Sequence, residues 1–311
     1  MSLDLKNVLA SAEARSRARG KAKALEPAPA APVPLPSLAP TPTPTRLPHW
    51  GESARGVPNA ALRSALFCAN LLGQHKREYV EMEEIFTQEG IRISRTGVHL
   101  DQGDLDAFVA IVHIARLQYL GKECRCTAAH ILDVMGLTDA GNNRKTLDGR
   151  LNRLKATVID LQDDRYGYQG NLIHEVYRDK KTNEYVIVLN EKLINLFAPN
   201  QFTKVEWSIR RALSRKPLAQ WLHGYYSSHA KPYPITIETL RNLCGSETEE
   251  LWKFTQTLRR ALAALTTACH THGQPFNHEI RGDLVEVQHQ PSPSQARHLA
   301  RCSAQTRRPK P

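Results

Sequence analysis

The sequence lacks any apolar run that approaches the roughly 20 residues a helix needs to span a bilayer. Its N-terminus also lacks the apolar core of a signal peptide. Both absences argue against a membrane protein or a secreted one, and we expect a cytoplasmic location. The six cysteines are therefore expected to be reduced thiols, with Cys124 and Cys126 on one face of a strand.

Motifs for metal and nucleotide chemistry are equally scarce. No CxxC pair occurs, and the cluster from Cys269 to His272 lacks the paired, separated ligand sets of structural zinc sites, so we interpret it as a helix end. No GxxxxGK[ST] phosphate loop occurs, which argues against nucleotide hydrolysis. We expect no metal, no cofactor and no enzymatic activity.

Acidic residues are outnumbered, with 31 Asp and Glu against 42 Lys and Arg and a net charge of +11. Such a surplus favours polyanionic partners, because basic side chains that neutralise phosphates release condensed counterions. Membrane surfaces are anionic too, so the charge alone does not name the partner.

Composition divides the chain into four parts. Residues 1–56 are expected to be a disordered arm with basic residues followed by a proline-rich linker over 27–48, because proline lacks an amide donor and favours extended chain. We expect one folded domain over 57–200, a second over 201–290, and a disordered basic tail over 291–311.

The first domain begins with a strand pair over 77–100 and continues with a helix over 102–120, a strand over 123–127 and a helix over 128–136. A basic helix follows within 142–160, anchored by a stripe of Leu147, Leu151, Leu154 and Val158. Strand–turn–strand signals come next, with a first turn at 165–170 and a second at 180–183.

The second domain repeats this order. A helix over 207–228 contains Pro217, which predicts a kink or break. A strand at 235–237, a short helix ending at Gly245, a long helix over 246–268 capped by Ser246, and a hairpin with its turn at 281–283 follow. The fold class we predict is therefore α+β, with two tandem winged helix-turn-helix domains.

A basic helix in the recognition position suggests binding in the DNA major groove. The candidate DNA-binding residues are the exposed basic and amide side chains of the two recognition helices and the two hairpin tips: Arg144, Lys145, Arg150, Asn152, Arg153, Lys155, Arg165, Lys253, Gln256, Thr257, Arg260 and Arg281. The first hairpin tip, 165–171, would be the wing of the first domain.

Five segments are familiar in this order: RSALF (63–67), TGVHL (96–100), LNRLKAT (151–157), LNEKLINLFAPNQFTKVEW (189–207) and YYSSHAKPYPITIETLRNLCGS (225–246). Through them the chain, from residue 58 to about 289, resembles the TrfA-type initiators of theta-mode plasmid replication. The resemblance implies a bacterial, plasmid-associated protein that binds direct repeats (iterons) of double-stranded origin DNA and opens an adjacent AT-rich region. It also implies contact with the host replicative helicase and its loading proteins, and a monomer–dimer equilibrium that serves copy control.

The chain departs from the family pattern in three places. The N-terminal part has no good copy of the QLxLF-like segment that docks on the sliding clamp, and we interpret Leu66 and Phe67 as packing residues. The second recognition helix opens with Glu249 and Glu250, so the repeat sequence it reads is expected to differ. The proline-rich linker has no clear counterpart.

Two other functions remain open from the sequence. A winged-helix transcription regulator would need the same groove contacts. A rolling-circle nickase would use a tyrosine nucleophile, for which Tyr225 and Tyr226 are candidates, but it also needs a metal held by two histidines that flank an apolar residue. The only His-x-His, at 270–272, has threonine between. The dimer interface could use the first domain or the strands before it.

Overall fold

The computed structural model describes residues 46–70, 77–88, 90–163, 167–179, 181–182 and 184–306. The expected basic arm and linker therefore lie outside the described residues, apart from their last positions. Residues 44–311 form one compact unit, which contains two hydrophobic cores. No helix in the described ranges is long and apolar enough to cross a membrane.

Packing begins earlier than the boundary expected near residue 55. Leu47 and Trp50 are buried, with exposed fractions of 6% and 1%. The Trp50 indole stacks on Phe197 at 5.9 Å between ring centroids and donates its N–H to His113 Nδ1 at 3.0 Å. The chain enters the fold at this tryptophan, a large apolar residue that the proline-rich composition around it concealed.

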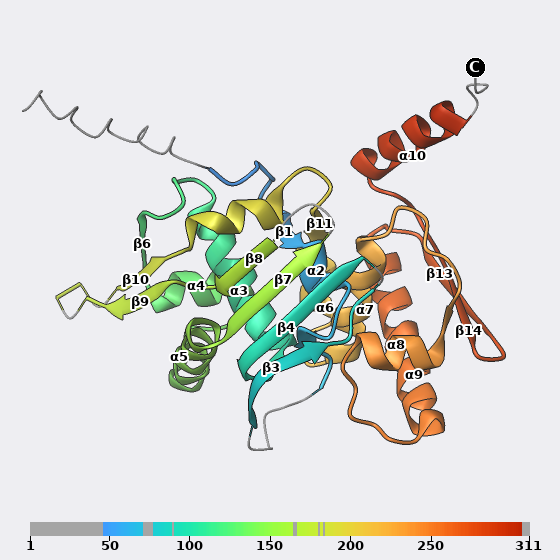
Figure 1. Cartoon of the computed structure of the whole chain (residues 1–311), viewed down its shortest axis with the longest axis horizontal. Helices are drawn as coiled ribbons and strands as arrows, with labels where there is room; N and C mark the ends of the chain where they lie inside the picture. The colour runs from blue at the N-terminus through green and yellow to red at the C-terminus, as the bar shows by residue number, and fades with distance from the viewer. Residues whose placement is uncertain are drawn as a thin grey trace, which may run out of the picture. The chain divides into compact units, whose positions relative to one another are not determined.

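The first core collects most elements of the N-terminal two thirds of the chain (Figure 1). In chain order they are β1 (Ala54–Pro58), α2 (Asn59–Leu62), β2 (Phe67–Cys68), β3 (Tyr79–Ile85), β4 (Ile91–Val98), β5 (Leu100–Asp101), α3 (Gln102–Ala115), β6 (Glu123–Cys126), α4 (Ala128–Met135), α5 (Gly141–Ala156), β7 (Val158–Asp163), β8 (Gly167–Asn171), β9 (Glu175–Arg178), β10 (Tyr185–Val188), the 3₁₀ helix η1 (Glu191–Phe197) and β11 (Phe202–Glu206). The expected strand pair over 77–100 is confirmed as β3 and β4, which pair antiparallel.

The hairpin directly after the basic helix, formed by β7 and β8, does not join the sheet that contains β6, although the wing expected at 165–171 includes β8 of this hairpin. Strand β7 pairs with β4 on one side and with β8 on the other, in a four-stranded sheet of order β3-β4-β7-β8. The strand β6 pairs instead with β10, in a three-stranded sheet of order β6-β10-β9. The second hairpin, with its turn between Asp179 and Glu184, therefore occupies the place that the sequence analysis assigned to 165–171.

Two helix ends also differ from the expectation. Helix α3 ends at Ala115 rather than near residue 120, and Leu117 beyond it is 69% exposed. Helix α5 ends at Ala156, so Val158 lies in β7 and is 37% exposed rather than part of the buried stripe. In both cases a helical spacing of apolar residues continued by chance past the point where the backbone leaves the helix.

The second core is built by the C-terminal part of the chain. Its elements are α6 (Trp207–Ala212), α7 (Pro217–Ser227), β12 (Ile235–Thr236), α8 (Ile237–Leu243), α9 (Leu251–Thr271), β13 (Phe276–Arg281) and β14 (Leu284–His289). The break expected at Pro217 is confirmed, because that residue starts α7. Helix α9 begins later than expected: Glu250 occupies the N-cap position, and Ser246 accepts only from the amide of Thr248.

The tail after residue 290 also differs from the expectation of disorder. It contains the helix α10 (Pro293–Thr306), drawn in red in Figure 1. Gln295 Nε2 of this helix donates to the carbonyl of Ser227, at the end of α7, at 2.8 Å.

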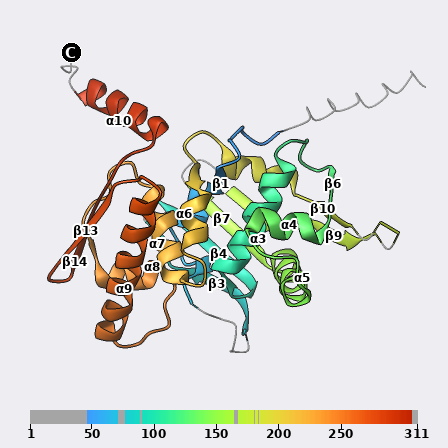
Figure 2. The ribbon, with the colours of Figure 1, turned by 180° about the vertical axis from the view of Figure 1, so that it is seen from behind.

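One order of elements occurs in both cores. A helix (α3 or α7) precedes a strand (β6 or β12), two further helices and a hairpin (β9–β10 or β13–β14), and that strand pairs with the last strand of the hairpin. In the first core β7 and β8 stand between the second of these helices and the hairpin. The sheet orders are β6-β10-β9 and β12-β14-β13, antiparallel throughout. In this order α5 and α9 correspond, since each is the second of the two helices that follow the strand; both are labelled in Figures 1 and 2.

Candidate nucleic-acid interface

Helix α5 is fixed to the first core by three leucines. Leu147, Leu151 and Leu154 have exposed fractions of 0%, 1% and 0%. Their spacing places them on one face of the helix, so the opposite face is available to solvent. Lys145, Asn152 and Lys155 are all exposed and, within the described part of the chain, make no ion pair.

Arg144 is exposed but held by a surface carboxylate. Its Nε and Nη2 donate to Asp139 at 2.5 and 2.6 Å, a bidentate arrangement. Asp139 precedes the helix, so this pair closes the turn between α4 and α5. A phosphate would have to compete with that carboxylate for Arg144.

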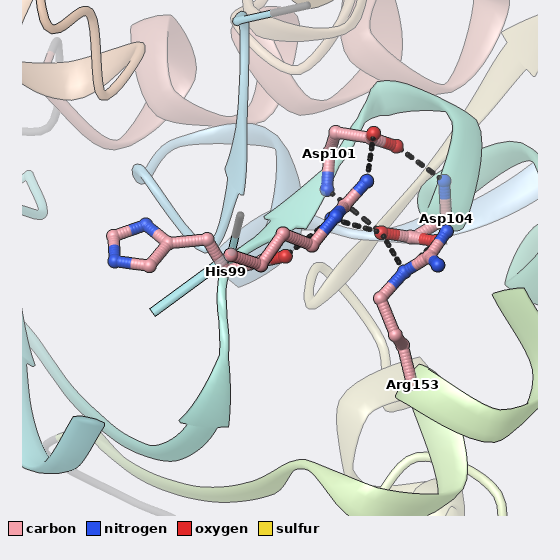
Figure 3. Close-up of polar contacts among 5 residues, drawn as sticks. His99, Asp101, Asp104 and Arg153 are labelled. Atoms are coloured by element: carbon pink, nitrogen blue, oxygen red, sulfur yellow. Dashed lines mark hydrogen bonds and ion pairs between the residues drawn. The ribbon is translucent and has the colours of Figure 1, made fainter. Parts of the chain in front are cut away.

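Arg153 has a structural partner that the sequence did not reveal (Figure 3). Its Nε lies 3.0 Å from Asp104 Oδ1, and its Nη2 lies 2.6 Å from the same atom. Asp104 is completely buried in the first turn of α3, and it also accepts from Arg77 Nη1 at 3.1 Å. Arg153 therefore ties α5 to α3, and its guanidinium faces the protein.

Asp104 belongs to a capping box at the start of α3. The side chain of Asp101 accepts from the amide of Asp104 at 2.9 Å, and Asp104 Oδ2 accepts from the amide of Asp101 at 3.0 Å. Burial and the neighbouring Asp101 raise the pKa of Asp104 above its usual range. Burial alone would also raise the pKa of Asp101, but the Arg77 guanidinium and the Asp104 amide outweigh it, and that pKa is lowered.

A cleft of about 1200 Å³ lies beside α5. Its lining includes the start of α3 and the side of α5 that carries Lys145, Gly149 and Arg150. Helix α6 and the turn to α7 also line it, and they contribute Arg211 and Arg215. No signal in the sequence pointed to these two arginines, because they lie within the helix expected over 207–228 and outside the two recognition helices.

Helix α9 presents a continuous polar face opposite its buried side. Phe254, Leu258, Leu262 and Leu265 are at most 2% exposed, which anchors the helix in the second core. The predicted side chains Lys253, Gln256, Thr257 and Arg260 are all exposed.

Two of these side chains interact within the helix. Lys253 Nζ lies 2.6 Å from Glu250 Oε2 and 5.4 Å from the ring centroid of Trp252, which is 66% exposed. Thr257 Oγ1 donates to the Lys253 carbonyl at 3.2 Å. Gln256 and Arg260 make no hydrogen bond or ion pair within the described ranges, so their side chains are available to a ligand.

Each hairpin tip contributes one arginine to the expected DNA-binding residues. Arg281, at the turn between β13 and β14, donates from Nε and Nη2 to Glu279 at 2.9 and 2.7 Å. Glu279 raises the pKa of Arg281 through these hydrogen bonds. Arg165 lies outside the described residues. Apart from Arg165 and Thr257, the expected DNA-binding residues thus form two sets: one on α5 and α9 that makes no ion pair with any described residue, and one already engaged by carboxylates.

The residues proposed for a nickase are buried. Tyr225 and Tyr226 are 4% and 2% exposed, and burial raises the pKa of Tyr225 to about 12. His223 is 4% exposed, and burial lowers its pKa to about 3. These side chains pack the second core and offer no accessible nucleophile.

The sequence interpretation of RSALF as packing is confirmed, because Leu66 and Phe67 are 3% and 0% exposed. Cys124 and Cys126 are both buried on β6, as expected for alternate residues of one strand. Within the described ranges no group of three or more His, Cys, Asp or Glu side chains is placed to hold a metal ion.

Comparison with known proteins assigns the chain to a family. The TrfA protein family model matches residues 45–280. The plasmid replication initiator protein TrfA of Escherichia coli is 30% identical over 224 residues, which cover 70% of this chain and 58% of that protein. The chain thus spans little more than half the length of that relative.

Solved structures resemble the chain more distantly. Two crystal structures of domains 2 and 3 of RctB align with TM-scores of 0.45 and 0.44 at 13% sequence identity, and each alignment covers 71% of this chain and 97% or 95% of the other. The match to the family model extends over the elements of both cores from β1 to β13. The chain belongs to the TrfA family.

Proposed function

We propose that this protein initiates plasmid replication by binding direct repeats at an origin through two tandem winged-helix domains, over 57–200 and 201–290. The observation that carries the proposal is a repeated arrangement in a member of the TrfA family. The sheet orders are β6-β10-β9 and β12-β14-β13, and in each case two helices stand in the chain between the edge strand (β6 or β12) and the hairpin that completes the sheet. That arrangement is typical of a winged helix-turn-helix, in which the second of these two helices enters the major groove.

In this proposal α5 and α9 are the recognition helices. Lys145, Asn152 and Lys155 on α5, and Gln256 and Arg260 on α9, are exposed and unpaired among the described residues. Amide side chains pair with adenine, and basic ones with guanine or with phosphates. The exposed faces therefore carry the side-chain types that sequence recognition needs.

Several other predicted residues take supporting parts. Arg144 and Arg281 would be released to phosphates from their surface carboxylates, Asp139 and Glu279. Arg153 positions α5 through buried Asp104 rather than contacting DNA.

The wings follow from the sheets. The wing of the first domain is the turn between β9 and β10, where Lys181 is exposed, and the wing of the second is the turn between β13 and β14. Strands β7 and β8, which precede and follow Arg165 in the sequence, belong to the four-stranded sheet with β3 and β4, so in this proposal they lie outside the first wing.

Two unlike domains on one chain suit direct repeats, whereas a symmetric dimer suits a palindrome. Linking the domains makes the second contact intramolecular, which raises affinity without a new kind of contact. Several bound copies would bend the flanking DNA and promote opening of an AT-rich region, at a cost of a few kcal/mol per site. Recruitment of the host replicative helicase and its loader, and self-association for copy control, complete the proposal.

The test is a plasmid that carries the candidate origin and depends on this protein supplied in trans. Replication that requires the protein, together with footprints on direct repeats beside an AT-rich stretch, would support an initiator. Binding to a promoter site without any replication would instead identify a transcription regulator, the main alternative. A nicked or covalently tagged product formed with supercoiled origin DNA and Mg²⁺ would contradict both.

A further inference from the structure

The cleft beside α5 carries a concentration of positive charge that the fold does not use. Of the residues that line it, Arg77 and Arg210 are neutralised by Asp101 and Asp106, at 2.5 Å in each case. Lys145, Arg150, Arg211 and Arg215 also line it, and none of these four makes an ion pair within the part of the chain that the structure describes. The acidic residues of the cleft are thus already matched, and four cations remain.

Both candidate recognition helices contribute to the cleft. Helix α5 lines it with residues between Asn142 and Arg153, and the C-cap residue of α9, His272, lines it as well. The polar face of α9 extends from Lys253 to this end over about 29 Å, at 1.5 Å per residue. One turn of B-DNA is about 34 Å. The cleft therefore borders one end of the polar face of α9 and the exposed face of α5.

Arg215 is held in a backbone conformation that arginine rarely adopts. Its φ angle is +62°, in the left-handed region that favours glycine. The strain sits in an exposed turn between α6 and α7, where no packing requires a long side chain. Strained residues of this kind concentrate at functional sites. The N-terminus of α7, next to Arg215, adds partial positive charge from the helix dipole, and its first turn contains no acidic residue that would offset this charge.

We propose that this cleft binds the phosphodiester backbone of the DNA segment between the two major-groove contacts, through Arg211 and Arg215 together with Lys145 and Arg150. The inference rests on the proposed function, because it takes α5 and α9 as the groove-reading helices. Arg211 and Arg215, which lie outside both recognition helices, add a third contact region that reads no base. The cations fit a chain of phosphates because two separate elements, α5 and the α6–α7 segment, contribute them to the lining of one cleft.

The experiment uses the full-length protein and two duplexes of equal length: one selected from a random-sequence pool by the wild-type protein, and a scrambled version of it. Affinity for both is measured across a salt series for wild type, Arg211→Gln, Arg215→Gly and the double variant. Each lost phosphate contact is expected to lower the slope of log K against log salt by about 0.9 and to weaken binding roughly eightfold at 0.1 M salt, equally for both duplexes.

Three controls separate the possible causes. Arg215→Lys keeps the charge and is expected to retain the wild-type slope. Arg301→Gln removes an exposed arginine of α10, far along the chain from the cleft, and is expected to change nothing. Thermal unfolding of Arg215→Gly is expected to be unchanged or shifted upward, because glycine relieves the left-handed strain.

The outcomes separate the two proposals. Wild-type affinity and slope in the double variant, with weakened selective binding in Gln256→Ala, would overturn the cleft and leave the proposed function standing. If the wild type selects no sequence, but the double variant still lowers the slope of log K against log salt on the scrambled duplex, direct-repeat recognition would be overturned and the phosphate-binding cleft would stand. Hydroxyl-radical footprints supply a second readout: backbone protection between the two groove contacts should disappear in the double variant only.

Discussion

Replacing Arg153 by alanine tests whether this residue reads DNA or holds the fold. The substitution removes the two guanidinium donors that Arg153 directs at Asp104, at 2.6 and 3.0 Å, and it leaves a carboxylate with no solvent exposure. Breaking a buried ion pair by removing one partner costs about 3–5 kcal/mol. The side chain of Arg153 is 23% exposed, and Arg77 still donates to Asp104. We therefore expect a loss at the low end of that range, about 3 kcal/mol.

The assay is urea unfolding at pH 7 followed by circular dichroism, with Asn152→Ala and Lys155→Ala as matched controls on the same helix. Both control side chains are exposed, and each substitution should change the free energy of unfolding by no more than about 0.5 kcal/mol. In the double variant Arg153→Ala with Asp104→Asn, the loss should be smaller than the sum of the two single losses, because the unpaired charge is gone.

The reasoning would be refuted by an Arg153→Ala protein that unfolds at the wild-type urea concentration but binds DNA with a reduced salt slope. That result would mean that the guanidinium leaves Asp104 for a phosphate when DNA binds. Reduced stability with an unchanged salt slope would support the structural assignment.

Other predictions concern the second core and the second recognition helix. Gln256→Ala should lower the preference for the selected duplex by about 1–3 kcal/mol without changing the salt slope, whereas Arg260→Ala should also lower the slope if its contact is to a phosphate; competition binding measures both. Burial lowers the pKa of His223 to about 3, so the contribution of this residue to stability is present above pH 6.5. As pH falls below that value, the free energy of unfolding should decrease by about 1.4 kcal/mol per pH unit. Urea unfolding of His223→Asn between pH 7 and 5 should lack this pH dependence. The buried hydroxyl of Tyr226 has no hydrogen-bond partner among the described residues, so Tyr226→Phe should raise the free energy of unfolding by about 1–3 kcal/mol. If this variant and the wild type leave supercoiled origin DNA in the same state, the result would agree with a packing role for Tyr226. Leu258→Ala, at a position with no exposure, should lower the free energy of unfolding by about 2–5 kcal/mol in the same measurement.

Local signals in the sequence were sufficient for much of the second half of the chain. The break at Pro217 follows from a missing amide donor, and the buried face of α9 follows from apolar residues at helical spacing. The buried stripe of α5 was predicted for the same reason, up to Leu154. These features depend on interactions between residues a few positions apart, which a single sequence displays directly.

Pairing between distant strands was not predictable in this way. Strand signals at 158–163 and 185–188 look alike, and only the tertiary structure decided that the first pairs with β4 and the second with β6. The basic residues of α5 raise the same difficulty. Arg153 and Lys155 are of one chemical class and two positions apart, yet one meets buried Asp104 and the other faces solvent.

The sequence by itself determined the charge, the helices with their apolar faces, and the family, because each is written in residue types at short spacing or in colinear segments. Only the tertiary structure decided which cations are free. That outcome depends on where the carboxylates of other elements come to lie. Among the residues that the structure describes, it left Arg211 and Arg215 in the cleft without an ion pair, while Arg77, Arg153 and Arg210 were neutralised.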